Sequence, residues 1–246
     1  MGTETSVRGY GLNSNTLKFI AIIAMTIDHL TWVLASDYLM NPGIILLHMI
    51  GRITAPIMCY FVAEGYYHTH DLKKYITRMF IFAIISHFAY NFAFGIPFVP
   101  FKTGVLNQTG VIWALAWGLV ALAAAESDKL KQWQKTTALI LCCVVAFCAD
   151  WSSIAVLWVF YFGTNRGNLK KQATKMMMVI SVYALVFIIF VNEVYGLLQL
   201  SVALAIPLIS MYNGERGSWK GMKWFFYAYY PLHLIIVGLI RIALTH

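Results

Sequence analysis

The sequence has few charged residues. Asp, Glu, Lys and Arg make up 11% of the 246 residues, and apolar residues make up 60%. Soluble domains carry about 25% charged and about 45–50% apolar residues. The chain has too little charge to cover a water-soluble surface, so the composition excludes an ordinary soluble domain.

Cysteine is also scarce. The four cysteines, Cys59, Cys142, Cys143 and Cys148, all lie within apolar segments. No Cys-x-x-Cys pair has a matching partner pair, so the sequence predicts neither a disulfide framework nor a zinc site. We interpret these residues as buried free thiols.

Acidic residues number only 10 against 18 basic ones, which gives a net charge of +8. Such a charge can attract nucleic acid. Here, however, the basic residues form short clusters between apolar runs, where the positive-inside rule of membrane proteins places them. We therefore expect membrane lipid as the surrounding medium and no nucleic-acid partner.

Long apolar runs dominate the sequence. A helix needs roughly 20 apolar residues to cross a bilayer. Two of the predicted crossings, the fifth and sixth, are short, and a single long helix is the alternative there. The nine predicted crossings are 17–36, 43–66, 76–95, 105–125, 136–149, 153–164, 176–192, 196–212 and 224–243.

The basic residues indicate the topology. With the N-terminus inside, fifteen of the 18 basic residues, from Arg8 onward, fall on the inner side; only Lys102 and Arg241 fall outside, and Arg52 lies within a crossing. Fusing the fifth and sixth crossings would place a basic loop outside. This favours a hairpin with Asp150 at its outer tip.

The aromatic residues agree with this topology, because Trp and Tyr concentrate at membrane interfaces. They mark the outer end of the first crossing and the inner start of the ninth: Trp32, Tyr38, Trp219, Trp224 and Tyr227. We predict one all-α domain over residues 1–246, a polytopic helical membrane bundle. Residues 1–16 form a cytoplasmic segment, no cleavable signal peptide is expected, and the C-terminus lies outside.

Several ionisable residues interrupt the apolar runs near mid-depth of the bilayer. An ionisable side chain costs about 2.5–3.5 kcal/mol at the centre of a spanning helix, so each needs a partner or a function. The shared depth predicts that they converge on one polar pocket. These residues are Asp28, His29, Arg52, His87 and His233; His48 is a further ionisable residue in the same apolar run as Arg52.

Asp28 and His29 are adjacent, so their side chains diverge by about 100° around a helix. Asp28 is therefore expected to hold Arg52 or another imidazole, which leaves His29 to face a reacting group as a general base. The structural alternative is a buried Asp28–Arg52 ion pair that only fixes packing, with the histidines hydrogen-bonded in the core.

Two prolines lie close to these polar residues. Pro231 removes the backbone donor for the carbonyl of Tyr227, two residues before His233, and Pro56 acts similarly one turn after Arg52. We expect the helices to kink or open there.

A second polar cluster lies at the inner end of the second crossing. Glu64 and His68 share a helix face, and Lys73, Lys74 and Arg78 follow. These basic residues, or those of the 166–175 loop, can bind phosphates of a cytoplasmic donor, although topological anchoring explains them almost as well. The His-Thr-His-Asp run at 68–71 is too generic to predict a metal site.

Three motifs together resemble one family. In chain order they are Leu17-Lys-Phe-Ile-Ala-Ile-Ile-Ala-Met-Thr-Ile-Asp28-His29, then Gly51-Arg52-Ile-Thr-Ala-Pro56 leading to Glu64-Gly65, then Tyr229-Tyr230-Pro231-Leu232-His233-Leu234. Together they resemble the TraX family. Its named member acetylates F-type conjugative pilin. The family is similar to the wider transmembrane acyltransferases, including bacterial sugar O-acetylases and the lysosomal heparan-sulfate enzyme.

The resemblance implies acetyl-CoA as cytoplasmic donor and an outer acceptor, a pilin, another peptide or a glycan, at a bacterial inner membrane. It implies His29 as the catalytic histidine, supported by Asp28 and Arg52, with His233 near the site. Two other hypotheses remain: a proton-coupled transporter or channel that uses the same Asp, His and Arg residues, and a non-catalytic scaffold.

Overall fold

The structure is a computed structural model that describes residues 11–35 and 41–245. Arg8 and Tyr38, used above for topology, lie outside these ranges. Most of the described residues are helical. In chain order the helices are α1 (Ser14–Leu34), α2 (Pro42–Gly51), α3 (Thr54–His68), α4 (Leu72–Phe94), α5 (Val111–Ala125), α6 (Gln132–Ala146), α7 (Ser152–Thr164), α8 (Leu169–Phe190), α9 (Glu193–Gln199), the 3₁₀ helix η1 (Leu200–Leu204), α10 (Ala205–Ser210) and α11 (Met222–Thr245).

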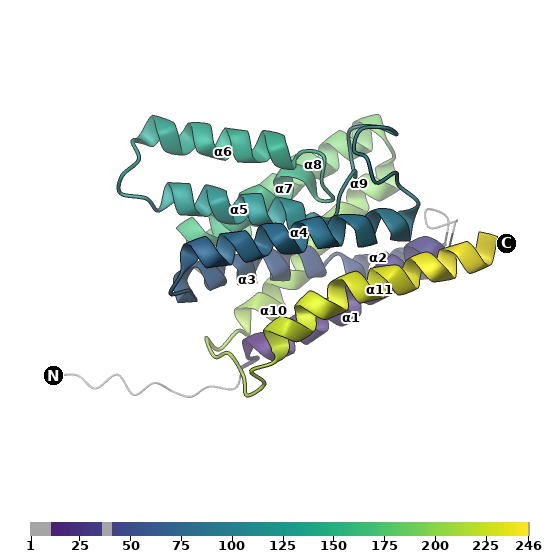
Figure 1. Cartoon of the computed structure of the whole chain (residues 1–246), viewed down its shortest axis with the longest axis horizontal. Helices are drawn as coiled ribbons and strands as arrows, with labels where there is room; N and C mark the ends of the chain where they lie inside the picture. Colours follow the sequence, from purple (N-terminus) through teal and green to yellow (C-terminus); the bar gives the residue numbers. More distant parts are fainter. Residues whose placement is uncertain (1–10, 36–40, 246) are drawn as a thin grey trace.

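Each of the nine segments predicted from the apolar runs contains helix, although 105–125 is helical only from Val111 and 43–66 is interrupted at Arg52. Six helical units are long and apolar enough to cross a membrane: α1, α2 with α3, α4, α8, residues 193–210, and α11. The protein is therefore a multi-pass membrane protein. The helices run roughly side by side, and α1 begins at the opposite end of the bundle from the C-terminus (Figure 1). Large apolar side chains such as Val182 and Ile189 are exposed on the outside of α8, where lipid would contact them.

The fifth and sixth predicted segments form a hairpin, as predicted, and not one long helix. α6 ends at Ala146, and α7 begins at Ser152. Trp151 adopts a left-handed conformation with φ of 59°, which reverses the chain. The Ser153 hydroxyl donates a hydrogen bond to the carbonyl of Cys143 and ties the two helices together.

The second predicted crossing is broken near its middle. α2 ends at Gly51 and α3 begins at Thr54, so Arg52 and Ile53 form a turn between them. Pro56 has no N–H to donate to the carbonyl of Arg52, four residues earlier, which explains why the helix is interrupted there. The break places Arg52 in a buried turn inside the bundle and not within a regular helix.

A second interruption lies in residues 193–210, where η1 separates α9 from α10. Pro207 removes the donor that would pair with Ala203 in an α-helix. By contrast, α11 stays helical through Pro231. The structure therefore shows no break in the helix at Pro231.

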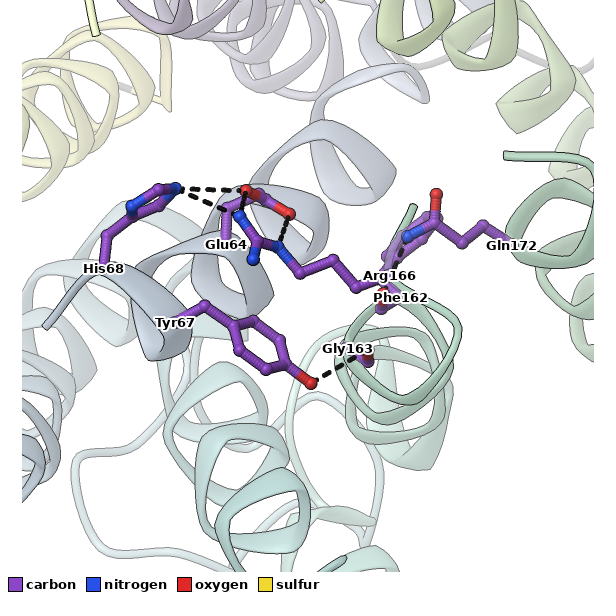
Figure 2. A network of polar contacts seen from close by, with 7 residues as sticks. All are labelled: Glu64, Tyr67, His68, Phe162, Gly163, Arg166 and Gln172. Atoms are coloured by element: carbon purple, nitrogen blue, oxygen red, sulfur yellow. Dashed lines mark hydrogen bonds and ion pairs between the residues drawn. The ribbon is translucent and has the colours of Figure 1, made fainter. Parts of the chain in front are cut away.

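An ion pair fastens α3 to the turn after α7 (Figure 2). Arg166 donates from Nε and Nη2 to both carboxylate oxygens of Glu64, at 2.9 and 3.0 Å. Tyr67 donates its hydroxyl hydrogen to the carbonyl of Gly163 beside it. Bidentate pairs of this kind fix geometry as well as adding attraction.

Candidate functional site

A cavity of about 240 Å³ lies inside the bundle, between α1, the α2–α3 break, α4, α5, the α6–α7 turn, α9 and α11. Most of its wall is aromatic or aliphatic, with a few polar side chains, the usual character of a small-molecule site. The polar and aromatic residues among those that line it are Asp28, His29, Trp32, Arg52, Thr54, Tyr90, Phe94, Asn107, Asp150, Trp151, Tyr195, Phe226 and Tyr230.

Asp28 is buried and binds His48 from α2. Its Oδ1 lies 2.7 Å from Nδ1 of His48, which is fully buried. Among the described residues, no ion pair within 4.0 Å joins Asp28 to Arg52. The sequence prediction that Asp28 holds another residue than His29 is confirmed, and its partner is an imidazole.

Gly51 makes this arrangement possible. A Cβ built on Gly51 would lie 2.3 Å from the Cβ of Asp28 and 2.7 Å from its Oδ1. The backbone of α2 therefore approaches α1 more closely than any side chain would allow. Glycine at this position allows Asp28 to contact His48. Arg52 is the next residue, so it lies directly after this close contact between the two helices.

Arg52 lies at the break between α2 and α3 and lines the cavity. It is buried, and its guanidinium carbon lies 5.4 Å from the ring of Trp151 and 5.7 Å from that of Tyr195. Its Nε and Nη2 have no hydrogen-bond acceptor within the described chain. Buried donors are nearly always satisfied, so this pair points to an acceptor that a ligand would bring.

His29 and His233 contact each other from α1 and α11. Nδ1 of His29 lies 2.9 Å from Nε2 of His233, and the rings are stacked with an interplanar angle of 6°. Nδ1 of His233 lies 3.0 Å from the carbonyl oxygen of Tyr229, one helical turn earlier.

This chain of contacts fixes the tautomers of two neutral rings. The Tyr229 carbonyl can only accept, so Nδ1 of His233 carries its hydrogen and Nε2 has the lone pair. Nδ1 of His29 must then donate to that lone pair. The lone pair of His29 is therefore on Nε2, and His29 lines the cavity. An imidazole held in one tautomer with a free lone pair can act as a base or nucleophile.

Asp150, from the α6–α7 turn, is a site residue that sequence reasoning missed. It was assigned only to the tip of a hairpin, yet it lines the cavity with Trp151. Burial raises the pKa of this carboxyl to about 6 and outweighs the opposing attraction of the Arg52 guanidinium. An acidic residue beside a tryptophan at a predicted hairpin tip was the available signal.

His87 does not join the cluster, so the prediction that it converges with the others is wrong. Its Nε2 lies 2.8 Å from the carbonyl of Phe98 in the segment after α4. Three residues further along α4, Tyr90 lines the cavity instead, as does Phe94. The inward face of α4 could not be identified from depth alone.

A second cavity, of about 530 Å³, adjoins the first near the start of α1 and α11. Glu64, His68 and Arg78 line it, whereas Lys73 and Lys74 do not. Lys74 instead lies 3.2 Å from Asp71 at the N-terminus of α4. The sequence did not indicate the remaining basic residues on this wall, Lys18, Arg216 and Lys223.

The two cavities have four lining residues in common, from α3, α5 and α11. These are Met58, Ile112, Leu115 and Phe226. The His29 cavity and the basic one therefore meet at an apolar neck formed by these four residues. No group of three or more His, Cys, Asp or Glu residues with metal-binding geometry occurs in residues 11–35 and 41–245.

Comparisons with known proteins agree with the resemblance in the motifs. The model of the TraX protein family matches residues 13–241. The probable fimbrial assembly protein FimC, serogroup H1, of Dichelobacter nodosus is 27% identical over 94% of this chain and 96% of its own length. An uncharacterized protein of Rickettsia prowazekii (strain Madrid E) is 25% identical over 53% of this chain and 60% of its own length. No solved structure matches.

Proposed function

Because the chain belongs to the TraX protein family, we propose that it is a membrane-embedded acyltransferase. It moves an acetyl group from acetyl-CoA to an amine or hydroxyl acceptor. One observation carries the proposal: His29, held in a single tautomer by His233, shares a cavity with the unpaired guanidinium nitrogens of Arg52. A base and an oxyanion donor in one cavity are what acyl transfer requires.

The donor supplies an acyl group activated as a thioester. The residues present fit such a molecule, because an apolar neck joins a basic cavity to the cavity that holds His29 and Arg52. Arg52 is placed to donate hydrogen bonds to a carbonyl oxygen as negative charge develops on it. In a water-poor interior such donors stabilise charge more strongly than in water.

His29 takes the proton. As the acceptor nitrogen or oxygen forms its bond to the acyl carbon, Nε2 of His29 removes the acceptor's proton. When the carbon–sulfur bond breaks, the same nitrogen returns this proton to the departing sulfur. The products are an acylated acceptor and a free thiol, and His29 ends neutral. His233 keeps Nδ1 of His29 as a donor throughout, so only Nε2 is available for the exchange.

We place the basic cavity on the cytoplasmic side of a bacterial inner membrane. This follows the bias of basic residues, with the N-terminus inside, nine crossings that include the shorter α5, α6 and α7, and the C-terminus outside. The acceptor then reaches the His29 cavity from the outer side. A fimbrial assembly protein among the relatives favours the N-terminal amine of a pilin-like peptide as acceptor.

The test uses purified protein in nanodiscs with radiolabelled acetyl-CoA and a peptide amine. We expect acetylated peptide with the wild type, and a His29→Ala variant that folds but transfers at least 10²-fold more slowly. His87→Ala is the matched control, because His87 lies outside the cavity, and it should keep wild-type activity. Full transfer by His29→Ala would refute the proposal. Proton-driven flux in liposomes without transfer would establish the transporter instead.

A further inference from the structure

Four basic side chains surround the larger cavity from separate elements: Lys18 of α1, Arg78 of α4, Arg216 of the segment between α10 and α11, and Lys223 of α11. Within the described part of the chain, none of them forms an ion pair within 4.0 Å. Four unneutralised cations around one cavity repel each other, so their convergence needs an explanation.

The carboxylate in the same wall does not neutralise these four cations. Glu64 is the one carboxylate among the described residues that line this cavity. Both of its oxygens already accept hydrogen bonds from Arg166, which is not part of the lining (Figure 2). The hydrogen bonds that Arg166 donates to Glu64 raise the pKa of the Arg166 guanidinium, so Arg166 stays charged beside this carboxylate. The cavity therefore keeps its excess of positive charge.

The segment that carries Arg216 is fixed to the start of α1. The carbonyl of Arg216 accepts hydrogen bonds from the backbone N–H of Asn15 and the hydroxyl of Ser14. The Asn15 side-chain amide donates to the carbonyl of Trp219 at 3.0 Å. Arg216 is thus held beside Lys18 by backbone contacts, and the cationic wall is preformed.

Two further features of this cavity favour an anion as its ligand. Nε of Arg78 is buried and has no hydrogen-bond partner in the described chain. The cavity measures about 530 Å³, within the range of about 300–1,000 Å³ typical of ligand sites. Guanidinium and ammonium groups that form no ion pair with the protein are the usual binding groups for phosphates.

The distance to the reacting histidine is also suitable. Lys18 and His29 both lie on α1, eleven residues apart, which corresponds to about 16 Å along the helix. An extended pantetheine arm has a comparable length. The neck formed by Met58, Ile112, Leu115 and Phe226 lies between the two cavities and is apolar enough to contact such an arm.

We propose that Lys18, Arg78, Arg216 and Lys223 form a phosphate-binding site that selects a nucleotide-bearing acyl donor. The phosphates bind at this cationic wall, and the arm reaches through the neck toward His29. The assignment deepens the proposed function. The acyl group of the ligand rests on that function, but the binding of phosphates at this site does not depend on it. It replaces Lys73 and Lys74, the residues expected from sequence, which lie outside the cavity.

The experiment measures binding by calorimetry with the full-length protein in nanodiscs. The probes are CoA, 3′-dephospho-CoA and pantetheine. We expect the wild type to bind CoA more tightly than dephospho-CoA and far more tightly than pantetheine, with affinity for CoA falling steeply as salt rises. A Lys18→Gln/Arg216→Gln variant should bind CoA at least tenfold more weakly and pantetheine unchanged.

Lys73→Gln is the matched control, since it removes a nearby lysine that does not line the cavity. It should bind CoA as the wild type does. Equal loss in Lys73→Gln, or wild-type CoA affinity in the double variant, would overturn the site. If the double variant does not fold, the wild-type comparison of the three probes decides: equal affinity for CoA and pantetheine refutes the proposal.

The outcomes separate this inference from the proposed function. Binding of CoA that depends on the four cations, without acetyl transfer to any amine or hydroxyl, would keep the phosphate site and remove the acyltransferase assignment. Acetyl transfer that is indifferent to these residues, and to the phosphates of the donor, would do the reverse.

Discussion

Nδ1 of His29 and Nε2 of His233 lie 2.9 Å apart, although the residues are separated by 204 positions in the chain. Because Nδ1 of His233 is committed to the carbonyl of Tyr229, this single contact determines which nitrogen of His29 is basic. The relationship resembles the way a second group orients the base in other acyl-transfer sites. In the proposed reaction, His233 is a positioning residue and His29 is the catalytic one.

Replacing His233 should slow transfer without weakening donor binding. We expect His233→Ala to lower kcat by about 10²-fold, because His29 loses the acceptor that fixes its tautomer. The KM for acetyl-CoA should stay within about twofold. The measurement is steady-state acetylation of a peptide amine.

Rescue distinguishes positioning from a purely structural role. A glutamine at position 233 offers a side-chain oxygen that can accept from Nδ1 of His29. His233→Gln should therefore recover part of the lost kcat, whereas His233→Leu should not. Equal activity in both variants would contradict the tautomer argument.

Arg52 should be sensitive even to a conservative change. Arg52→Lys keeps the charge but loses the planar fork whose Nε and Nη2 are unpaired. We expect kcat to fall by about 10²–10³-fold, the usual cost of losing one oxyanion donor. Thermal unfolding of the same preparation checks that the fold survives. A variant with unchanged kcat would show that Arg52 only supports packing.

Gly51→Ala should destabilise the protein. The new Cβ would lie 2.3 Å from that of Asp28, so α1 and α2 must separate, at a cost of about 1–3 kcal/mol in the free energy of unfolding. Transfer should fall as well, because Arg52 follows directly. Gly43→Ala, in the first turn of the same helix, is the control. Its Cβ would meet only Asn41 Oδ1, at 3.2 Å, and stability should change by less than about 1 kcal/mol.

The raised pKa of the Asp150 carboxyl predicts that the stability of the folded protein depends on pH. Burial raises the pKa of its carboxyl from 3.8 to about 6 in the folded protein. The folded state therefore binds the proton more tightly than the unfolded state does. The stabilisation is complete below about pH 4 and is lost as pH rises through about 6. Asp150→Asn should flatten this part of the melting-temperature profile and raise the melting temperature at pH 7. An unchanged profile would contradict the assignment.

Local sequence features determined most of the fold. Apolar runs indicated the six helical units of the described chain that are long and apolar enough to cross a membrane, because the length of an apolar run and its lack of charge decide whether it can lie in hydrocarbon. The position of Pro56 indicated a disturbance at Arg52, and the helix breaks there. The adjacency of Asp28 and His29 correctly predicted that they face different partners. Each of these inferences depends on neighbours along one helix.

Tertiary packing decided the composition of the site. Depth placed His87 with the other ionisable residues, but the rotation of α4 turns Tyr90 and Phe94 inward and leaves His87 to Phe98. The rotation of α4 about its own axis depends on which helices pack against it. The weakly amphipathic sequence of a membrane helix gives little indication of those packing partners. In the same way Asp150, Lys18 and Arg216 reach the cavities through contacts between segments remote in the chain.

The sequence by itself determined that this chain is a multi-pass membrane protein, an all-helical bundle with ionisable groups within its apolar segments. Only the tertiary structure decided that His48, and not Arg52, binds Asp28, and that His233 sets the tautomer of His29. The physical reason is the range of the forces. Hydrophobic burial acts on each segment separately, whereas a hydrogen bond needs two atoms within about 3 Å, a distance that only the packed helices fix.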